Sequence, residues 1–264
     1  MDLQIKGKRA VVSGSTAGIG YAIAAALARA GAAVVVNGRT SARVDAAVGR
    51  IRAEQAGATV EGVACDLGTP AGADRLFEAV PEADILVNNL GIFEPKAFAD
   101  ITDEDWLRFF EVNVLSGVRL SRHYLPAMVA RKWGRVVFIS SESAVQIPAE
   151  MIHYGTTKTA QVALARGLAE SVAGTGVTVN SVLPGPTASE GVSTFVADMA
   201  RARGVDAATV EREFFQTVRP SSLIKRFATP DEVAAMVCYV CSGLASATTG
   251  AALRVDGGVI RAIL

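Results

Sequence analysis

The chain alternates short β-branched apolar runs with longer alanine-rich segments in which apolar positions recur every three to four residues. Runs such as Val34-Val35-Val36 are apolar throughout, which is typical of strands covered on both faces of a parallel sheet. The longer segments have the period of amphipathic helices. This rhythm predicts an α/β fold, a doubly wound parallel sheet with helices on both faces. About seven strands are expected, at residues 9–12, 34–37, 60–64, 85–88, 135–140, 177–182 and 251–255.

The second half of the chain contains the longest helical patterns. One helix is expected over residues 103–131, broken or kinked near Pro126, because proline lacks the amide hydrogen that a helix interior uses. Two more are expected over residues 152–173 and 230–242. No linker or internal repeat interrupts the pattern, so residues 1–264 are expected to form one domain.

Residues 190–228 break this rhythm. They contain charged helix-like stretches and two aromatic residues, Phe214 and Phe215, that are expected to be exposed. The segment is too long for an ordinary connection, and long insertions beside the carboxyl edge of a sheet often close over a ligand. We expect a helical lid over the substrate; a surface excursion or an oligomer contact is the alternative.

Composition and charge limit the kinds of partner that the protein is expected to bind. Half of the residues are hydrophobic, the formal net charge is zero and no basic stretch stands out. Neither nucleic acid nor an anionic membrane surface is therefore expected as a partner. The first ten residues lack the apolar centre of a signal peptide, and no window holds the roughly 18 apolar residues of a spanning helix. A cytoplasmic protein that binds small molecules is expected.

The three cysteines, an odd number, provide no disulfide framework. Cys238 and Cys241 form a C-x-x-C motif, but it lies in an apolar, helix-like run where this spacing puts both side chains on one face. A redox motif would need exposure at the start of a helix, and a zinc site would need further ligands nearby. A buried structural pair is expected, and no metal site.

A glycine-rich turn follows the first strand and opens the first helix. Gly14, Gly18 and Gly20 fall where the chain must leave a strand sharply, approach a pyrophosphate closely and begin a helix whose amides favour that anion. The spacing is G-x-x-x-G-x-G rather than the common G-x-G-x-x-G. A merely structural turn is the alternative, but the position between strand and helix favours a Rossmann-type dinucleotide site.

The end of the second strand bears on the choice of cofactor. An NAD enzyme would present an acidic residue there to the ribose 2′-hydroxyl, and this chain has Arg39 instead. An arginine suits a 2′-phosphate, so NADP is expected, with NAD as the alternative if Arg39 is only a solvated side chain.

A second group of polar residues has the spacing of a proton-transfer site. Ser141 precedes Tyr154 by thirteen residues, and Tyr154 precedes Lys158 by four, which is one helical turn. The ammonium of Lys158 is expected to lower the pKa of the tyrosine, normally near 10, so that it can exchange a proton with a carbonyl or alcohol oxygen.

Five separated motifs now stand in a definite order: Gly14-x-x-x-Gly18-Ile19-Gly20, Asn88-Asn89-Leu90-Gly91, Asn113, Ser141 and Tyr154-x-x-x-Lys158. Together they resemble the short-chain dehydrogenase/reductase family over almost the whole chain. The resemblance implies that Tyr154 is the acid and base and that Lys158 binds the nicotinamide ribose. It implies that Ser141 holds the substrate oxygen and Asn113 supports a relay water. Ser140 or Ser143 as the working serine, and Asn113 as an ordinary polar helix residue, are weaker alternatives, and His153 is expected to be non-catalytic.

The resemblance also implies a cofactor-binding set. Its members are Gly14, Ser15, Thr16, Gly18, Ile19, Gly20, Arg39, Asp66, Leu67, Asn89, Leu90, Gly91, Tyr154, Lys158, Pro184, Gly185, Thr187 and Ser189. Three positions depart from the family pattern: Leu90 replaces alanine, Ser189 stands where threonine is common, and Ala17 stands where NADP members often have a basic residue.

The resemblance implies an oxidoreductase that moves a hydride between NADP(H) and a carbonyl or secondary alcohol, such as a 3-oxoacyl thioester or a related ketone. It also implies a homotetramer or homodimer. A non-catalytic dinucleotide sensor or scaffold is the alternative from another class, and a dehydratase or epimerase is a weaker one. The substrate is not determined by the sequence, although residues 190–228 and Glu142, beside Ser141, are expected to line its site.

Overall fold

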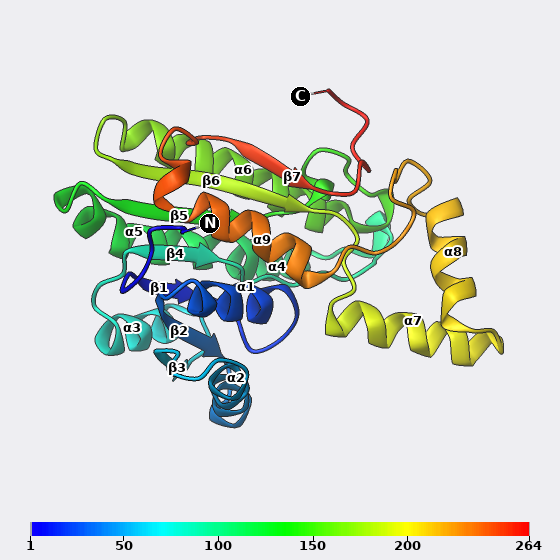
Figure 1. The fold of residues 1–264 in the computed structure, drawn as a ribbon. Helices are drawn as coiled ribbons and strands as arrows, with labels where there is room; N and C mark the ends of the chain where they lie inside the picture. Colours follow the sequence, from blue (N-terminus) through cyan, green and yellow to red (C-terminus); the bar gives the residue numbers. More distant parts are fainter. Residues whose placement is uncertain (1, 264) are drawn as a thin grey trace.

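Seven parallel strands lie side by side in the computed structural model, which describes residues 2–263 (Figure 1). Their order across the sheet is β3-β2-β1-β4-β5-β6-β7, so the chain moves to one edge and then returns past β1 to the other. The strands are β1 (Arg9–Val12), β2 (Ala33–Gly38), β3 (Val60–Ala64), β4 (Ile85–Asn88), β5 (Gly134–Ile139), β6 (Val177–Pro184) and β7 (Ala252–Val255). The expected doubly wound sheet is confirmed.

Helices cover both faces of the sheet. One face packs against α1 (Gly18–Arg29), α2 (Ser41–Glu54) and α9 (Pro230–Val240). The other packs against α3 (Pro70–Ala79), α5 (Ser116–Ala130) and α6 (Ile152–Ser171).

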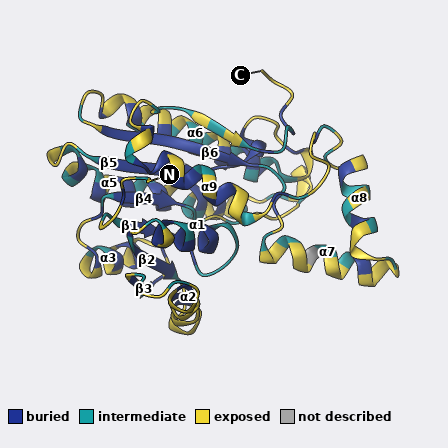
Figure 2. Ribbon diagram, in the orientation of Figure 1, coloured by how far each residue is buried: buried dark blue, intermediate teal, exposed yellow. Residues whose placement is uncertain are grey.

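Successive strand residues contribute to opposite cores. Val34 and Val36 belong to the core under α1, whereas Val35 belongs to the core under α5. This is why the strand is apolar at every position. Figure 2 shows the sheet buried between helices whose outer faces are exposed.

The long helical pattern is interrupted, but not at Pro126. It divides into α4 (Asp103–Phe110), a wider π-helical turn over Glu111–Leu115, and α5, which continues through Pro126. A break near Pro126 is therefore wrong, while a kink there stays a prediction. The interruption lies where Asn113 turns its side chain into the protein, and wider turns of this kind often occur at functional sites.

The segment after β6 forms two helices, α7 (Glu190–Arg203) and α8 (Ala207–Thr217), which stand apart from the sheet (Figure 1). Gly204 ends α7 with a left-handed backbone, φ 64°, and Asp206 caps α8. The expected exposure of Phe214 and Phe215 is wrong: Phe215 is 2% exposed and Phe214 is half-buried. Both pack against Phe227, with ring centroids 5.1 Å apart, and so form a small core of their own.

The cysteine pair is structural, as expected. Cys238 and Cys241 are both buried at the end of α9, and burial raises the pKa of the Cys238 thiol to about 12. Within residues 2–263, no cluster of three or more His, Cys, Asp or Glu side chains could hold a metal ion. None of the helices described there is long and apolar enough to cross a membrane.

Candidate active site

The glycine turn lies at the carboxyl edge of the sheet, between β1 and α1. Gly14 and Gly18 have positive φ angles of 59° and 56°, which glycine adopts without strain. A Cβ on Gly20 would lie 2.4 Å from Asn89 Nδ2, and Asn89 in turn donates to the carbonyl of Gly14 at 3.0 Å. Each glycine is required by backbone conformation or by close packing.

The turn fits an anion. Ala17 stands at the N-cap of α1, where its methyl group cannot accept from the first free amides as a serine or aspartate would. Ser15 does not compete for these amides, because its buried hydroxyl donates to the carbonyl of Val12 at 2.6 Å and accepts from Asn37 N at 2.9 Å. The helix start therefore retains the donors and the dipole that a pyrophosphate needs.

The neighbouring strand ends place further predicted cofactor residues at the same edge. Arg39 is exposed directly after β2. Asp66 is exposed after β3, where its carboxylate accepts from Gly68 N at 3.0 Å. Leu67 is 1% exposed and belongs to the core under α5, so only its backbone can reach a ligand.

The loops after β4 and β6 close the edge from two sides. A Cβ on Gly91 would lie 3.3 Å from Lys158 Nζ, so this glycine borders the predicted catalytic residue Lys158. A Cβ on Gly18 would lie 3.3 Å from Ser189 Cβ, which joins the loop after β6 to the glycine turn. Thr187 is buried and donates to the carbonyl of Gly185 at 2.9 Å.

Ser141, Tyr154 and Lys158 meet where β5 ends and α6 begins. Lys158 Nζ lies 5.6 Å from the centre of the Tyr154 ring, and Ser141 is among the residues that influence the pKa of this tyrosine. Ser140 is engaged elsewhere, because its hydroxyl donates to the carbonyl of Lys158 at 2.8 Å. Ser141 as the working serine stays a prediction.

The expected effect of Lys158 on the tyrosine is wrong for the protein as it stands. Burial raises the pKa of Tyr154 and the negative charge of Glu142 adds to the rise, while the positive charge of Arg219 opposes it. Burial also lowers the pKa of Lys158 to about 8. The ammonium of Lys158 donates to the carbonyl of Ile139 at 3.0 Å and to Gln161 Oε1 at 3.2 Å rather than to the phenol.

Asn113 is buried and anchors the loop after β4. Its Oδ1 accepts from Ile92 N at 2.7 Å, and its Nδ2 donates to the Ile92 carbonyl and to Thr157, both at 3.0 Å. The structure thus gives Asn113 a positioning role that an ordinary surface residue of a helix would not have.

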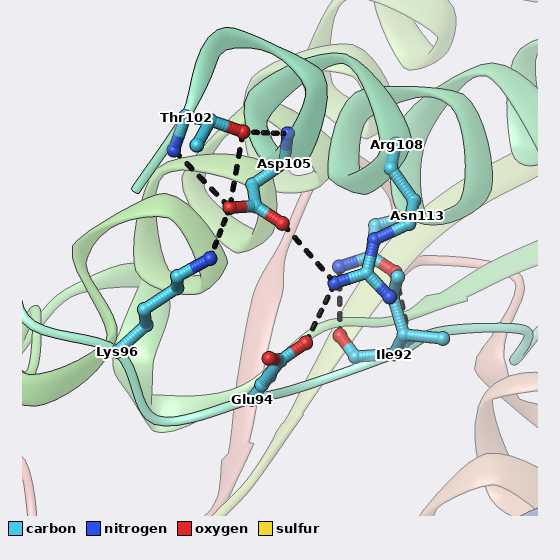
Figure 3. A network of polar contacts seen from close by, with 7 residues as sticks. All are labelled: Ile92, Glu94, Lys96, Thr102, Asp105, Arg108 and Asn113. Carbon is cyan, nitrogen blue, oxygen red and sulfur yellow. Dashed lines mark hydrogen bonds and ion pairs between the residues drawn. The ribbon is translucent and has the colours of Figure 1, made fainter. Parts of the chain in front are cut away.

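Charged pairs fasten the same loop to α4, as Figure 3 shows. Lys96 pairs with Asp105 at 2.5 Å, and Arg108 pairs with Glu94 at 2.6 Å. The loop carries Phe93, whose ring meets Tyr154 edge-on with the ring centres 6.3 Å apart.

His153 lies away from the reacting groups. It is fully buried, and its ring is 4.0 Å from that of Phe109 and 6.1 Å from that of Trp106. Burial lowers the pKa of this histidine, so the neutral ring is favoured. This packing agrees with a non-catalytic residue.

The structure adds residues that sequence reasoning missed. Gln161 connects Lys158 with the main-chain carbonyl of Asn113, to which it donates at 2.5 Å. Its position three residues after Lys158 could have revealed it, because that spacing shares a helix face. Arg219 reaches Glu142 from 77 residues away, and no local pattern could have indicated that contact.

The sheet order and the glycine turn at its carboxyl edge together define a Rossmann-type dinucleotide-binding α/β protein. A family model described as Enoyl-(Acyl carrier protein) reductase matches residues 14–260. The "Uncharacterized oxidoreductase YvaG" of Bacillus subtilis is 49% identical over 100% of both chains. The 3-oxoacyl-[acyl-carrier-protein] reductase FabG of Aquifex aeolicus is 34% identical, with 98% of this chain and 100% of that protein aligned.

Among solved structures, L-sorbose reductase from Gluconobacter frateurii, complexed with NADPH and L-sorbose, superposes with a TM-score of 0.93. It is 32% identical, and the match covers 100% of both chains. The chain therefore belongs to the short-chain dehydrogenase/reductase family and is an NAD(P)-dependent oxidoreductase.

Proposed function

We propose that this protein transfers a hydride between NADP(H) and a carbonyl compound or secondary alcohol, with Tyr154 as general acid and base. The observation that carries the proposal is the meeting of Tyr154, Ser141 and Lys158 beside a glycine turn that fits a pyrophosphate. A bound nicotinamide supplies the hydride in reduction and accepts it in oxidation.

The proton steps belong to the protein. In reduction, Tyr154 gives its phenolic proton to the developing alkoxide oxygen, and in oxidation it takes a proton from the alcohol. Burial keeps the phenol protonated, which suits the acid, while the charge of Arg219 favours the phenolate that the base requires. Lys158 holds the nicotinamide ribose, and Asn113 positions the Ile92 loop and supports the relay water that the family resemblance implies.

NADP is the proposed cofactor, with NAD as the alternative. The exposed Arg39 at the end of β2 offers a planar cation to a 2′-phosphate, and the structurally similar L-sorbose reductase was solved with NADPH. The residues proposed to bind the cofactor are those inferred from the family resemblance, with Ser15 and Leu67 acting through their backbones.

We further propose that residues 190–228 form the substrate lid. The helices α7 and α8 stand beside the carboxyl edge, and the segment that follows them returns Arg219 to the site. The relatives' names include a 3-oxoacyl thioester reductase and a ketose reductase, so both substrate classes are candidates.

A homodimer or homotetramer in the cytoplasm is proposed. A surface groove of about 390 Å³ runs between α5 and α6. Apolar side chains such as Val118, Leu125 and Leu164 line it, as expected of a helical face that packs against a second copy.

Purified protein tests the proposed reaction. NADPH oxidation, followed by its absorbance, should occur with at least one member of a panel of ketoses, simple ketones and 3-oxoacyl thioesters. NADP reduction should occur with the corresponding alcohols. Tight NADPH binding without turnover of any compound would contradict the enzyme and support a sensor.

A further inference from the structure

A buried charged pair lies beside the serine of the site. The Glu142 side chain is 7% exposed and that of Arg219 is 11% exposed. Glu142 Oε1 accepts from Arg219 Nε at 3.1 Å, and Glu142 Oε2 accepts from Ser141 Oγ at 2.5 Å. Both oxygens of the carboxylate are therefore held in fixed directions.

This pair is costly to keep for packing alone. Removing two charges from water is expensive, and apolar residues of similar volume often stabilise a protein at least as well. Arg219 comes from the segment after α8, while Glu142 follows β5, so the pair joins the end of the proposed lid to the catalytic loop. Its place beside Tyr154, whose pKa both charges influence, makes a role in substrate binding the better explanation.

The hydrogen-bond directions limit what the site can accept. Ser141 has a single hydroxyl proton, and it is donated to Glu142. A carboxylate has about four acceptor positions, and the protein contacts described above occupy two of them. Glu142 therefore still offers acceptor positions beside the reacting group.

We propose that Glu142, held by Arg219, determines specificity by accepting a hydrogen bond from a hydroxyl on the carbon next to the reacting carbonyl. The preferred substrates are then α-hydroxy ketones, as in ketoses, and the vicinal diols formed from them. The inference rests on the proposed oxidoreductase function and chooses between its two substrate classes.

A 3-oxoacyl thioester fits this arrangement poorly. Its second functional group is a carbonyl, which is an acceptor and would face the carboxylate without a proton to share. Nor does the site favour an anionic substrate, because Arg219 is already neutralised by Glu142 and by the exposed Glu150, 3.3 Å away. A neutral compound with a hydroxyl donor matches both observations.

Two ketones that differ in one donor test the proposal. Hydroxyacetone carries the hydroxyl, and methoxyacetone has the same framework with that proton replaced by methyl. With NADPH, kcat/KM for hydroxyacetone should exceed that for methoxyacetone by about tenfold or more, since a site built for a hydroxyl rejects an analogue that lacks it. A 3-oxoacyl thioester should also be the poorer substrate.

Two variants assign the preference to Glu142. In Glu142→Gln the ratio of the two kcat/KM values should fall several-fold, because the acceptor loses its charge. In the double variant Glu142→Leu with Arg219→Leu, which leaves no buried charge unpaired, the ratio should approach one. Glu150→Gln is the matched control: Arg219 loses an exposed partner while Glu142 is unchanged, and the ratio should persist.

The outcomes separate the inference from the function on which it rests. Equal turnover of the two ketones, or a ratio that survives in both Glu142 variants, would overturn the inference and leave the oxidoreductase intact. Binding of NADPH without turnover of any ketone would overturn both.

Discussion

At the scale of single residues, the site depends on how each buried polar side chain uses its few hydrogen bonds. Lys158 donates to Ile139 and to Gln161, and Gln161 passes the connection to the Asn113 carbonyl. The side-chain amide of Gln161 therefore bridges Lys158 and Asn113. Tyr154 is left with Ser141 as its polar neighbour.

Substitutions of Gln161 should move the pH profile in opposite directions. Burial lowers the pKa of Lys158 to about 8, and the Gln161 oxygen favours the charged form. Gln161→Leu removes that acceptor, so the alkaline limb of kcat/KM should shift to lower pH. Gln161→Glu adds a negative charge and should shift it to higher pH. Shifts in the same direction, or none, would contradict a positioning role.

Arg39 should determine the choice of cofactor. Arg39→Ala removes a charge-assisted contact to the 2′-phosphate, so KM for NADPH should rise about tenfold while KM for NADH changes little. Arg50→Ala, an exposed arginine on α2, is the control and should leave both constants unchanged. A preference for NADH in the unmodified protein would refute the assignment.

At the scale of elements, strand positions were predicted well and helix interruptions were not. The bounds of β1, β3 and β4 agree with the predicted ones. β1 and β4 are apolar runs buried within the sheet, whereas β3 is an edge strand with Glu61 and Gly62 exposed. The π-helical turn at Asn113 depends on contacts with Ile92 and Thr157, which are distant in sequence. A local pattern could not show it.

The turn between β1 and α1 should tolerate no side chain at its third glycine. A Cβ on Gly20 would overlap Asn89 and the Gly14 carbonyl, so Gly20→Ala should destabilise the protein by about 1–3 kcal/mol and weaken NADPH binding. Thermal unfolding and cofactor fluorescence measure the two effects. Gly49→Ala, where nothing lies within 4 Å, should raise stability by about 0.5–1 kcal/mol. Equal behaviour of the two variants would contradict the packing argument.

At the scale of the whole molecule, the parallel sheet brings residues from every part of the chain to one edge. Family motifs indicated most of the candidate site, because they lie at strand ends whose place follows from the sheet order. Arg219 could not be predicted to reach Glu142, since its position depends on how α7 and α8 return to the sheet. The burial of Phe214 and Phe215 could not be predicted for the same reason, because the ring that packs against both is Phe227.

The groove between α5 and α6 should be covered by a second copy. The molecular mass measured by light scattering should be that of a dimer or tetramer. Leu164→Arg should lower this mass, because it places a charge on an apolar face. Ala46→Arg, on the exposed side of α2, should not change the assembly. A monomeric unmodified protein would contradict the proposal.

The proposed proton transfer depends on the phenol of Tyr154, and Tyr154→Phe removes that hydroxyl alone. Single-turnover reduction of hydroxyacetone by bound NADPH should slow by about 10² to 10⁴-fold, the usual contribution of a general acid. The dissociation constant for NADPH should stay nearly unchanged. Near-normal turnover in this variant would contradict the mechanism.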